Sequence, residues 1–183
     1  MRRLVVAFVV LATGILGCGP GAATPGLTGQ PTAGEPTATS PAPAGGVPAA
    51  DQLCGLFTEL AVGVLGGPVD EPQFGDVVPR PNGVYCRYSL TGNANTNVEV
   101  QVKESSRADA EALAATMGAA TPVANLGEVA FRRDSSSLGG GGVTLVAWSS
   151  GIGLTVVVNR EDADQALMNA AAEGIARAIL AAT

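Results

Sequence analysis

Residues 143–158 read VTLVAWSSGIGLTVVV, two apolar segments separated by the short tripeptide Ser149-Ser150-Gly151. A Ser-Gly step between two such segments is typical of a hairpin turn. The sequence therefore predicts strands over 143–148 and 152–158. Strands joined by a hairpin pair antiparallel, so this stretch indicates an antiparallel sheet.

The preceding sequence extends this pattern. Apolar and polar residues alternate over 84–90 and again over 98–103, and the segment 91–95, TGNAN, lies between them as a turn. In the second of these strands Glu99, Gln101 and Lys103 are the polar members, which indicates one face in contact with water. A further short strand is predicted over 129–132.

Three amphipathic helices accompany these strands. The first is predicted to begin at Asp51 as its N-cap and to end at residues 66–68. Ser106 and Asp109 resemble a capping box that opens the second, and Asp162 is predicted to cap the third. The predicted order is α-β-β-α-β-β-β-α. We expect an α+β domain over 51–183, with an antiparallel sheet of about five strands covered on one face by the helices.

The first 17 residues, MRRLVVAFVVLATGILG, have the features of a signal peptide. Arg2 and Arg3 precede an apolar run of 13 residues, whereas a transmembrane helix needs about 20. Residues 15–18, ILGC, resemble the lipobox of bacterial lipoproteins. That resemblance implies that Cys18 becomes the first mature residue and carries diacylglycerol on its sulfur. The alternative is an ordinary secretory signal followed by a chance cysteine.

Residues 18–50 form the expected tether, a lipidated cysteine followed by a linker. Seven of the 12 prolines lie in this segment, among Gly, Ala and Thr, with Glu35 as its one charged residue. Such a composition cannot bury enough apolar surface to offset chain entropy, so we expect a disordered spacer. Its Thr, Ser and Pro content also fits O-linked glycosylation.

The charge and composition exclude several functions. Loss of Arg2 and Arg3 leaves eight basic against 16 acidic side chains, so nucleic acid is not an expected partner and membrane attachment should depend on the lipid anchor. The chain has no histidine, which excludes Ser-His-Asp and Cys-His catalysis and the usual zinc sites. We expect no catalytic residue, no metal and no cofactor.

Two cysteines remain after Cys18, namely Cys54 and Cys86. In the oxidising compartment expected for an exported chain such a pair tends to form a disulfide. That bond would connect the first helix to the first predicted strand. The alternative is a pair of buried thiols or a reactive thiol, for which no histidine is present as a base.

Three short motifs resemble small actinobacterial lipoproteins of unknown function. They are residues 51–58, DQLCGLFT, residues 85–88, YCRY, and residues 126–131, LGEVAF. The resemblance covers residues 51–183. It implies the same disulfide and an antiparallel α+β domain, and it implies no activity.

Candidate contacts for a partner are Arg132, Arg133 and Trp148. The two arginines lie in a polar segment, although a solvated strand end is the alternative, and Trp148 is the only tryptophan, although a core position is the alternative. We expect an extracytoplasmic lipoprotein of the cell membrane that is not an enzyme. It would act as a binding or accessory module for an envelope protein, a cell-wall component or a small apolar ligand. The alternatives are an envelope hydrolase with paired carboxylates and a passive structural lipoprotein.

Overall fold

The computed structural model describes residues 46–77, 82–135 and 141–183, all within the compact unit Pro41–Thr183. The predicted signal peptide, Cys18 and nearly all of the predicted linker lie outside the described residues. No helix within the described ranges is long and apolar enough to cross a membrane.

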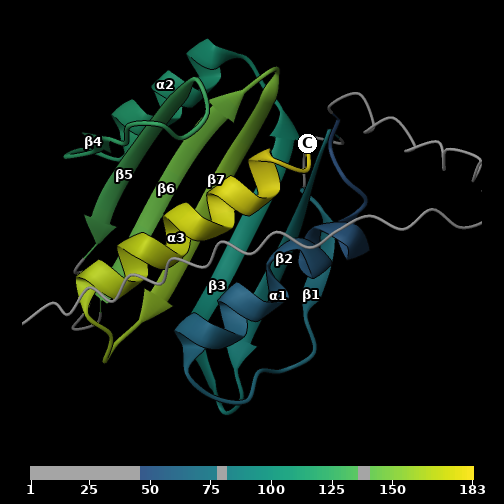
Figure 1. Cartoon of the computed structure of the whole chain (residues 1–183), viewed down its shortest axis with the longest axis vertical. Helices are drawn as coiled ribbons and strands as arrows, with labels where there is room; N and C mark the ends of the chain where they lie inside the picture. The colour runs from purple at the N-terminus through teal and green to yellow at the C-terminus, as the bar shows by residue number, and fades with distance from the viewer. Residues whose placement is uncertain (1–45, 78–81, 136–140) are drawn as a thin grey trace, which may run out of the picture. The chain divides into compact units, whose positions relative to one another are not determined.

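The described residues form an α+β domain built on one antiparallel sheet (Figure 1). Its seven strands stand in the order β1-β2-β3-β7-β6-β5-β4, so β3 and β7 meet at the centre although they are far apart in the chain. The strands are β1 (Gln73–Asp76), β2 (Gly83–Leu90), β3 (Asn93–Glu104), β4 (Thr121–Pro122), β5 (Val129–Ser135), β6 (Gly141–Ser149) and β7 (Ile152–Arg160).

The predicted hairpin over 143–158 is confirmed as β6 and β7. Ser149 pairs with Ile152, which leaves Ser150 and Gly151 as a two-residue loop. Both loop residues have positive φ, 50° for Ser150 and 89° for Gly151, the signs that a type I′ turn requires. Glycine suits the second position because it adopts this conformation without steric cost.

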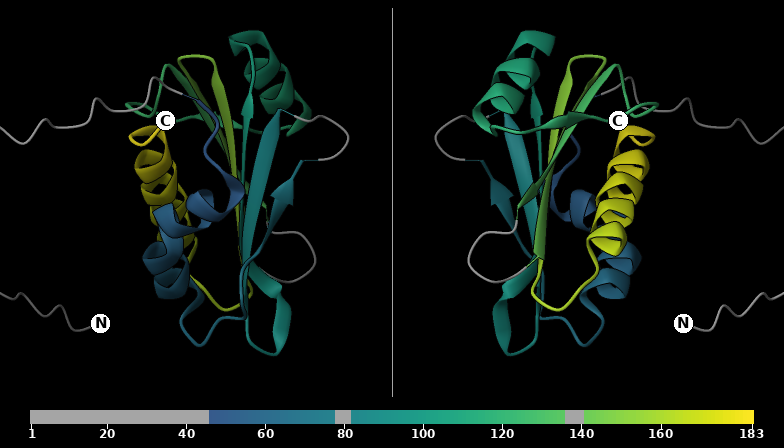
Figure 2. Two further views of the ribbon diagram at one scale, coloured as in Figure 1. Left: turned by 90° about the vertical axis from the view of Figure 1, so that its right-hand side faces the viewer. Right: turned by 90° about the vertical axis from the view of Figure 1, so that its left-hand side faces the viewer.

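Three helices pack on the sheet, and they do not share one face. Helices α1 (Ala50–Leu65) and α3 (Gln165–Leu180) lie side by side on one face, and α2 (Arg107–Thr116) lies on the other (Figure 2). The prediction that all helices cover one face is therefore wrong for α2. The reason lies in β6, because Leu145 and Ala147 pack in the main core, whereas Val146 packs with Ala110 and Met117 on the opposite side. We call the α1 and α3 side the inner face and the α2 side the outer face.

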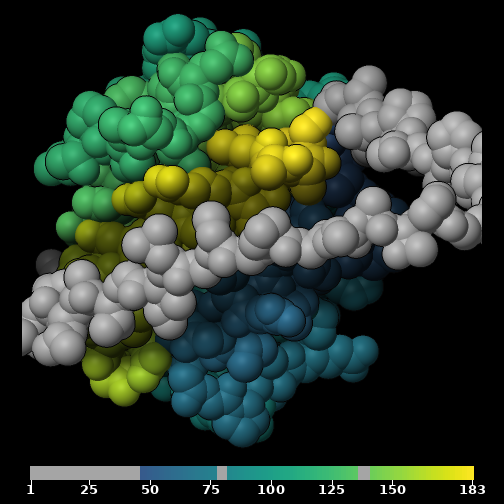
Figure 3. Space-filling view, in the orientation of Figure 1, coloured from purple at the N-terminus to yellow at the C-terminus, as the bar shows by residue number. Residues whose placement is uncertain are grey.

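The main core fills the space between the inner face and the two long helices. Figure 3 looks onto this side, where the atoms of α3 cross between those of the β4–β5 end and those of α1. Valines of the central strands meet aliphatic residues of both helices, and the fully buried ones include Val98, Val100, Val102, Val156, Val158, Leu53, Phe57, Met168, Ile175 and Ile179. Aliphatic burial of this kind supplies most of the driving force for folding.

Several predicted details need correction. The sheet has two strands more than the predicted five, because β1 and β4 were not predicted, and the order becomes α-β-β-β-α-β-β-β-β-α. Helix α1 begins earlier than predicted, with Ala49 as its N-cap and Asp51 in its first turn. The N-cap of α3 is Asp164, two residues after the predicted Asp162. The capping box of Ser106 and Asp109 at the start of α2 is confirmed.

Candidate functional site

The predicted disulfide is present. Cys54 in α1 and Cys86 in β2 are bonded, with their Cα atoms 5.4 Å apart, and both side chains are buried. Beside them the hydroxyl groups of Thr58 and Tyr88 lie 2.8 Å apart. The ring of Phe57 meets that of Tyr88 edge-on at 5.5 Å. This cluster fastens α1 to β2 and belongs to the core.

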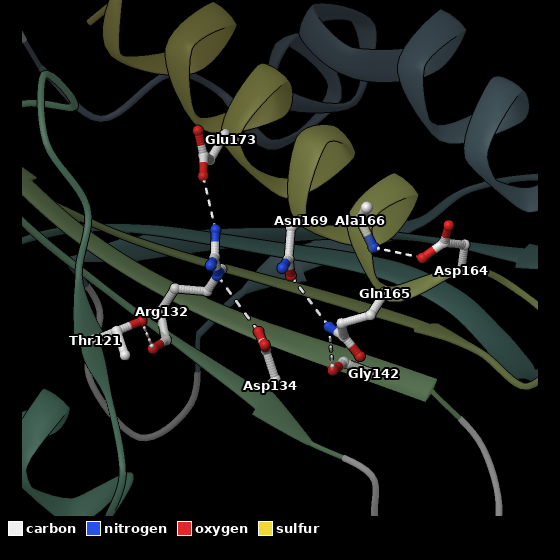
Figure 4. A network of polar contacts seen from close by, with 9 residues as sticks. All are labelled: Thr121, Arg132, Asp134, Gly142, Asp164, Gln165, Ala166, Asn169 and Glu173. Atoms are coloured by element: carbon white, nitrogen blue, oxygen red, sulfur yellow. Dashed lines mark hydrogen bonds and ion pairs between the residues drawn. The ribbon is translucent and has the colours of Figure 1, made fainter. Parts of the chain in front are cut away.

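Arg132 lies on the inner face, at the border between β5 and α3 (Figure 4). One terminal nitrogen of its guanidinium lies 2.8 Å from a carboxylate oxygen of Glu173 in α3, and Nε lies 3.3 Å from Asp134. Glu173 also receives a hydrogen bond from Arg177 at 3.3 Å. Thr121 in β4 donates to the carbonyl oxygen of Arg132 at 3.2 Å. These contacts connect the β4–β5 border of the sheet to α3.

The Arg132 cluster is also where two acids from different elements meet. Figure 4 shows the guanidinium between Asp134 on the strand and Glu173 on the helix. A hydrolase of the kind considered above needs two carboxyl groups separated by substrate and water. Here a basic side chain occupies the space between them, which is the arrangement of a structural ion-pair network.

Arg133 and Trp148 lie on the outer face, opposite to Arg132. Trp148 is half-buried against the small core under α2, and its Nε1 donates to the carbonyl oxygen of Ser105 at 2.9 Å. Arg133 is exposed and pairs across the sheet with Thr144, whereas Trp148 pairs with Val129 at the other end of β5. The structure therefore does not bring the three candidate contact residues together into one surface.

The outer face is covered only in part. Helix α2 packs on β5 and β6, and within the described residues no helix packs on this side of β1, β2 and β3, which lie beyond β7 (Figure 2). Two adjoining hollows occupy the uncovered part. The larger has a volume of about 420 Å³ and is lined by Gln73, Asp76, Val77, Tyr85, Arg87, Glu99 and Gln101. The smaller, of about 210 Å³, lies toward α2 and is lined by Val77, Asn82, Gln101, Lys103, Glu104, Ser105 and Asp109. We call the two together the outer-face hollow.

The register between β2 and β3 places the polar side chains of the outer-face hollow in adjacent rows. Arg87 of β2 stands directly opposite Glu99 of β3, and Tyr85 stands opposite Gln101. Gln101 donates to the carboxylate of Glu99 at 2.8 Å, and Arg87 donates to the carbonyl oxygen of Ala94 at 2.8 Å. These bonds hold the side chains in place before any ligand arrives, which lowers the entropic cost of binding.

A glycine of the edge strand lies beside Tyr85, one of the residues that line the larger hollow. Gly75 of β1 pairs with Tyr85, and a Cβ atom at position 75 would lie 3.4 Å from Cε1 of the tyrosine ring. The ring therefore leans over the backbone of the edge strand. A Cβ atom at this distance would be in ordinary van der Waals contact with the ring.

Another hollow, of about 480 Å³, lies on the inner side of the domain. It is lined by residues 55–60 of α1 alone. A binding site usually combines a few convergent polar groups from several elements. The outer-face hollow combines β1, β2, β3 and the segment that leads into α2, so it is the stronger candidate.

Among the described residues no group of three or more Cys, Asp and Glu side chains is arranged to hold a metal ion. Comparison with models of protein families, with curated proteins and with solved structures finds no match for this chain. The candidate site therefore depends on its own geometry. Sequence reasoning predicted the water-facing side of β3 but named none of its residues as a site.

Proposed function

We propose that this chain is an exported lipoprotein, held on the outer side of the cell membrane through Cys18, whose domain binds a component of the cell envelope in the outer-face hollow. The observation that carries the binding part is the incomplete cover of the sheet. Helix α2 shields β5 and β6 while Tyr85, Arg87, Glu99 and Gln101 remain accessible beside it. A hollow in which polar side chains from several elements converge is a candidate binding site.

The anchoring part is supported by the sequence of residues 1–18 and is tested separately. We expect Cys18→Ser to abolish acylation and, like globomycin, to leave a precursor that retains residues 1–17. Mass spectrometry of the wild-type N-terminal peptide should find the diacylglycerol-modified cysteine. An unmodified Cys18 thiol in the membrane fraction would exclude the lipid anchor.

The binding part is tested by photocrosslinking in intact cells that produce the chain. A photoreactive amino acid is placed at Gln101, within the hollow, and a matched one at Val62, which is 40% exposed on α1 at the other side of the sheet. We expect covalent adducts between the chain and envelope components when the photoreactive residue is at position 101, and none when it is at position 62. Equal labelling from both positions, or none from either, would favour the passive structural alternative.

The hydrolase alternative predicts a different result. It requires that envelope polysaccharide be shortened by the purified protein, and that Glu173→Gln or Asp134→Asn abolish this cleavage. We expect no change in polysaccharide length on incubation with the wild-type chain. Cleavage that depends on either acid would replace the binding proposal with an enzymatic one.

A further inference from the structure

We propose that the ligand of the outer-face hollow is a carbohydrate chain, bound across β1, β2 and β3 with a sugar ring on Tyr85. This inference rests on the proposed function and specifies the chemical class of its ligand. It follows from the aromatic ring, the planar polar groups, the excess of acids over bases and the shape of the hollow.

Tyr85 provides a flat apolar surface among polar groups. It lines the larger hollow, half-buried, and leans toward Gly75 on one side while Gln101 lies on the other. Pyranose rings have faces of C–H groups and edges of hydroxyl groups. A tyrosine ring supplies the complementary apolar surface and a hydroxyl that can hydrogen-bond at its rim.

Planar polar side chains surround this ring. Glu99 accepts hydrogen bonds only, Arg87 only donates, and Gln101 does both. Sugar hydroxyl groups both donate and accept, and neighbouring hydroxyls therefore suit adjacent donors and acceptors. The bond from Gln101 to Glu99 and the bond from Arg87 to Ala94 fix these groups in position, as required for selective recognition of a small polar ligand.

The charges of the hollow argue against other ligand classes. Two basic side chains, Arg87 and Lys103, are outnumbered by four acids, namely Asp76, Glu99, Glu104 and Asp109. Nucleic acids and other polyanions need a surplus of basic groups, and this surface has none. An apolar ligand would leave the charged groups desolvated without partners, which is costly. A polar ligand without negative charge meets neither obstacle.

The shape suits a chain molecule. The neighbouring strands β1, β2 and β3, together with β7 beside β3, span about 14 Å at roughly 4.8 Å between strands. The two hollows share Val77 and Gln101, so they adjoin each other, and the smaller one lies toward α2. The larger hollow, of about 420 Å³, is open to solvent rather than enclosed, as an extended ligand lying across the strands requires.

The test measures binding of two probes by the full lipidated chain in detergent micelles. One is the hexasaccharide of β-1,4-linked N-acetylglucosamine, and the other is protein-free wall polysaccharide from the cells that produce the chain. Calorimetry gives the affinity for the hexasaccharide, and co-sedimentation gives that for the polysaccharide. We expect Tyr85→Ala to weaken binding of the better probe at least tenfold and Gln101→Ala to weaken it severalfold.

Tyr85→Phe is the matched control, because it keeps the ring and should bind within about threefold of the wild type. Val62→Ala, on α1, should bind as the wild type does. Circular dichroism and an intact Cys54–Cys86 bond show that each variant is folded. Binding that is insensitive to Tyr85→Ala, or no binding of either probe, would overturn the carbohydrate proposal.

The photocrosslinking experiment separates this failure from failure of the proposed function. If position 101 captures a protein of the envelope and neither polysaccharide probe binds, the hollow is a binding site and the carbohydrate assignment is wrong. If position 101 captures nothing and neither probe binds, both proposals are overturned.

Discussion

Trp148 in β6 donates a 2.9 Å hydrogen bond from its indole nitrogen to the carbonyl oxygen of Ser105, the residue that follows β3. The backbone N–H of Ser105 donates in turn to the carbonyl oxygen of Gly151 in the β6–β7 turn, also at 2.9 Å. The segment between β3 and α2 is thereby fixed against the β6–β7 hairpin. Since Ser105 lines the outer-face hollow, these two bonds set the border of the hollow beside α2.

Trp148→Phe should loosen that border. The substitution keeps an aromatic ring against Ala110 and Met117 but removes the donor to Ser105. We expect a loss of about 1 kcal/mol in the free energy of unfolding, the usual contribution of such a hydrogen bond. Urea denaturation measures this loss. Relative to the wild type, amide hydrogen exchange in the variant should increase more in α2 than in α1. Unchanged exchange in α2 would show that packing alone holds the helix.

Loss of the disulfide should destabilise the domain more strongly. The bond closes a loop across a sequence separation of 32 residues, for which the chain-entropy model gives about 3–4 kcal/mol. The double variant Cys54→Ala/Cys86→Ala should therefore unfold at a clearly lower urea concentration. The oxidised wild type and the wild type under dithiothreitol provide the comparison without a change of sequence. Equal midpoints in all three would contradict the prediction.

The ion pair between Arg132 and Glu173 should be worth more than an exposed one. Their side chains are only 23% and 26% exposed, whereas Arg107 and Glu111 in α2 are 60% and 48% exposed. A double-mutant cycle with Arg132→Met and Glu173→Gln should give a coupling of about 1 kcal/mol. The matched cycle with Arg107→Met and Glu111→Gln should give about 0.3–0.5 kcal/mol. A larger coupling for the α2 pair would refute this ranking.

Arg160 at the end of β7 gives a pH-dependent contact. Its guanidinium donates to the carbonyl oxygen of Val64 in α1 at 2.7 Å and to the carboxylate of Asp162 at 2.9 Å. The hydrogen bond from Arg160 lowers the pKa of Asp162 below its ordinary value. A carboxyl group with a lowered folded-state pKa stabilises the fold above its unfolded-state pKa of about 3.9, and this stabilisation is lost as the pH falls through the lower folded-state pKa.

NMR titration of the Asp162 carboxyl carbon measures this effect directly. We expect a pKa below about 3.9 in the wild type and a return toward that value in Arg160→Met. The stabilisation itself should be small, because Asp162 is exposed. A titration curve that is identical in the two proteins would show that Arg160 does not influence the carboxylate.

The strand patterns carried most of the predictable information about the fold. The strands over 84–90 and 98–103 were found because burial on one face imposes a period of two, and those over 143–148 and 152–158 were found because two apolar segments flank a Ser-Gly turn. Strand β1 escaped because Gln73-Phe74-Gly75-Asp76 is short and has no alternating pattern, and its four residues are held by pairing with β2. Strand β4 is two residues long and contains Pro122, so its pairing with β5 has no local signal.

The position of α2 illustrates what local patterns leave undetermined. The sequence of residues 143–148 contained a signal for the position of α2. Val146 and Trp148 are apolar, and so are Leu145 and Ala147, which face the opposite side of the strand. A strand that is apolar on both sides is covered on both sides. The outer-face hollow depends on how far α2 reaches across the sheet. That extent follows from strand order, which places β1, β2 and β3 away from β6.

The central pairing of β3 with β7 also affects the order in which the chain folds after synthesis begins. A polypeptide made from its N-terminus completes β3 long before β7, since the paired Asn97 and Asn159 are 62 residues apart. Until then the nascent half-sheet has an open edge that can join another chain, and such distant pairing slows folding. Both Cys54 and Cys86 precede that edge, so in an oxidising compartment their bond can form before β7 pairs with β3. Aggregation during biogenesis would therefore start at β3, where a chaperone would have its greatest effect.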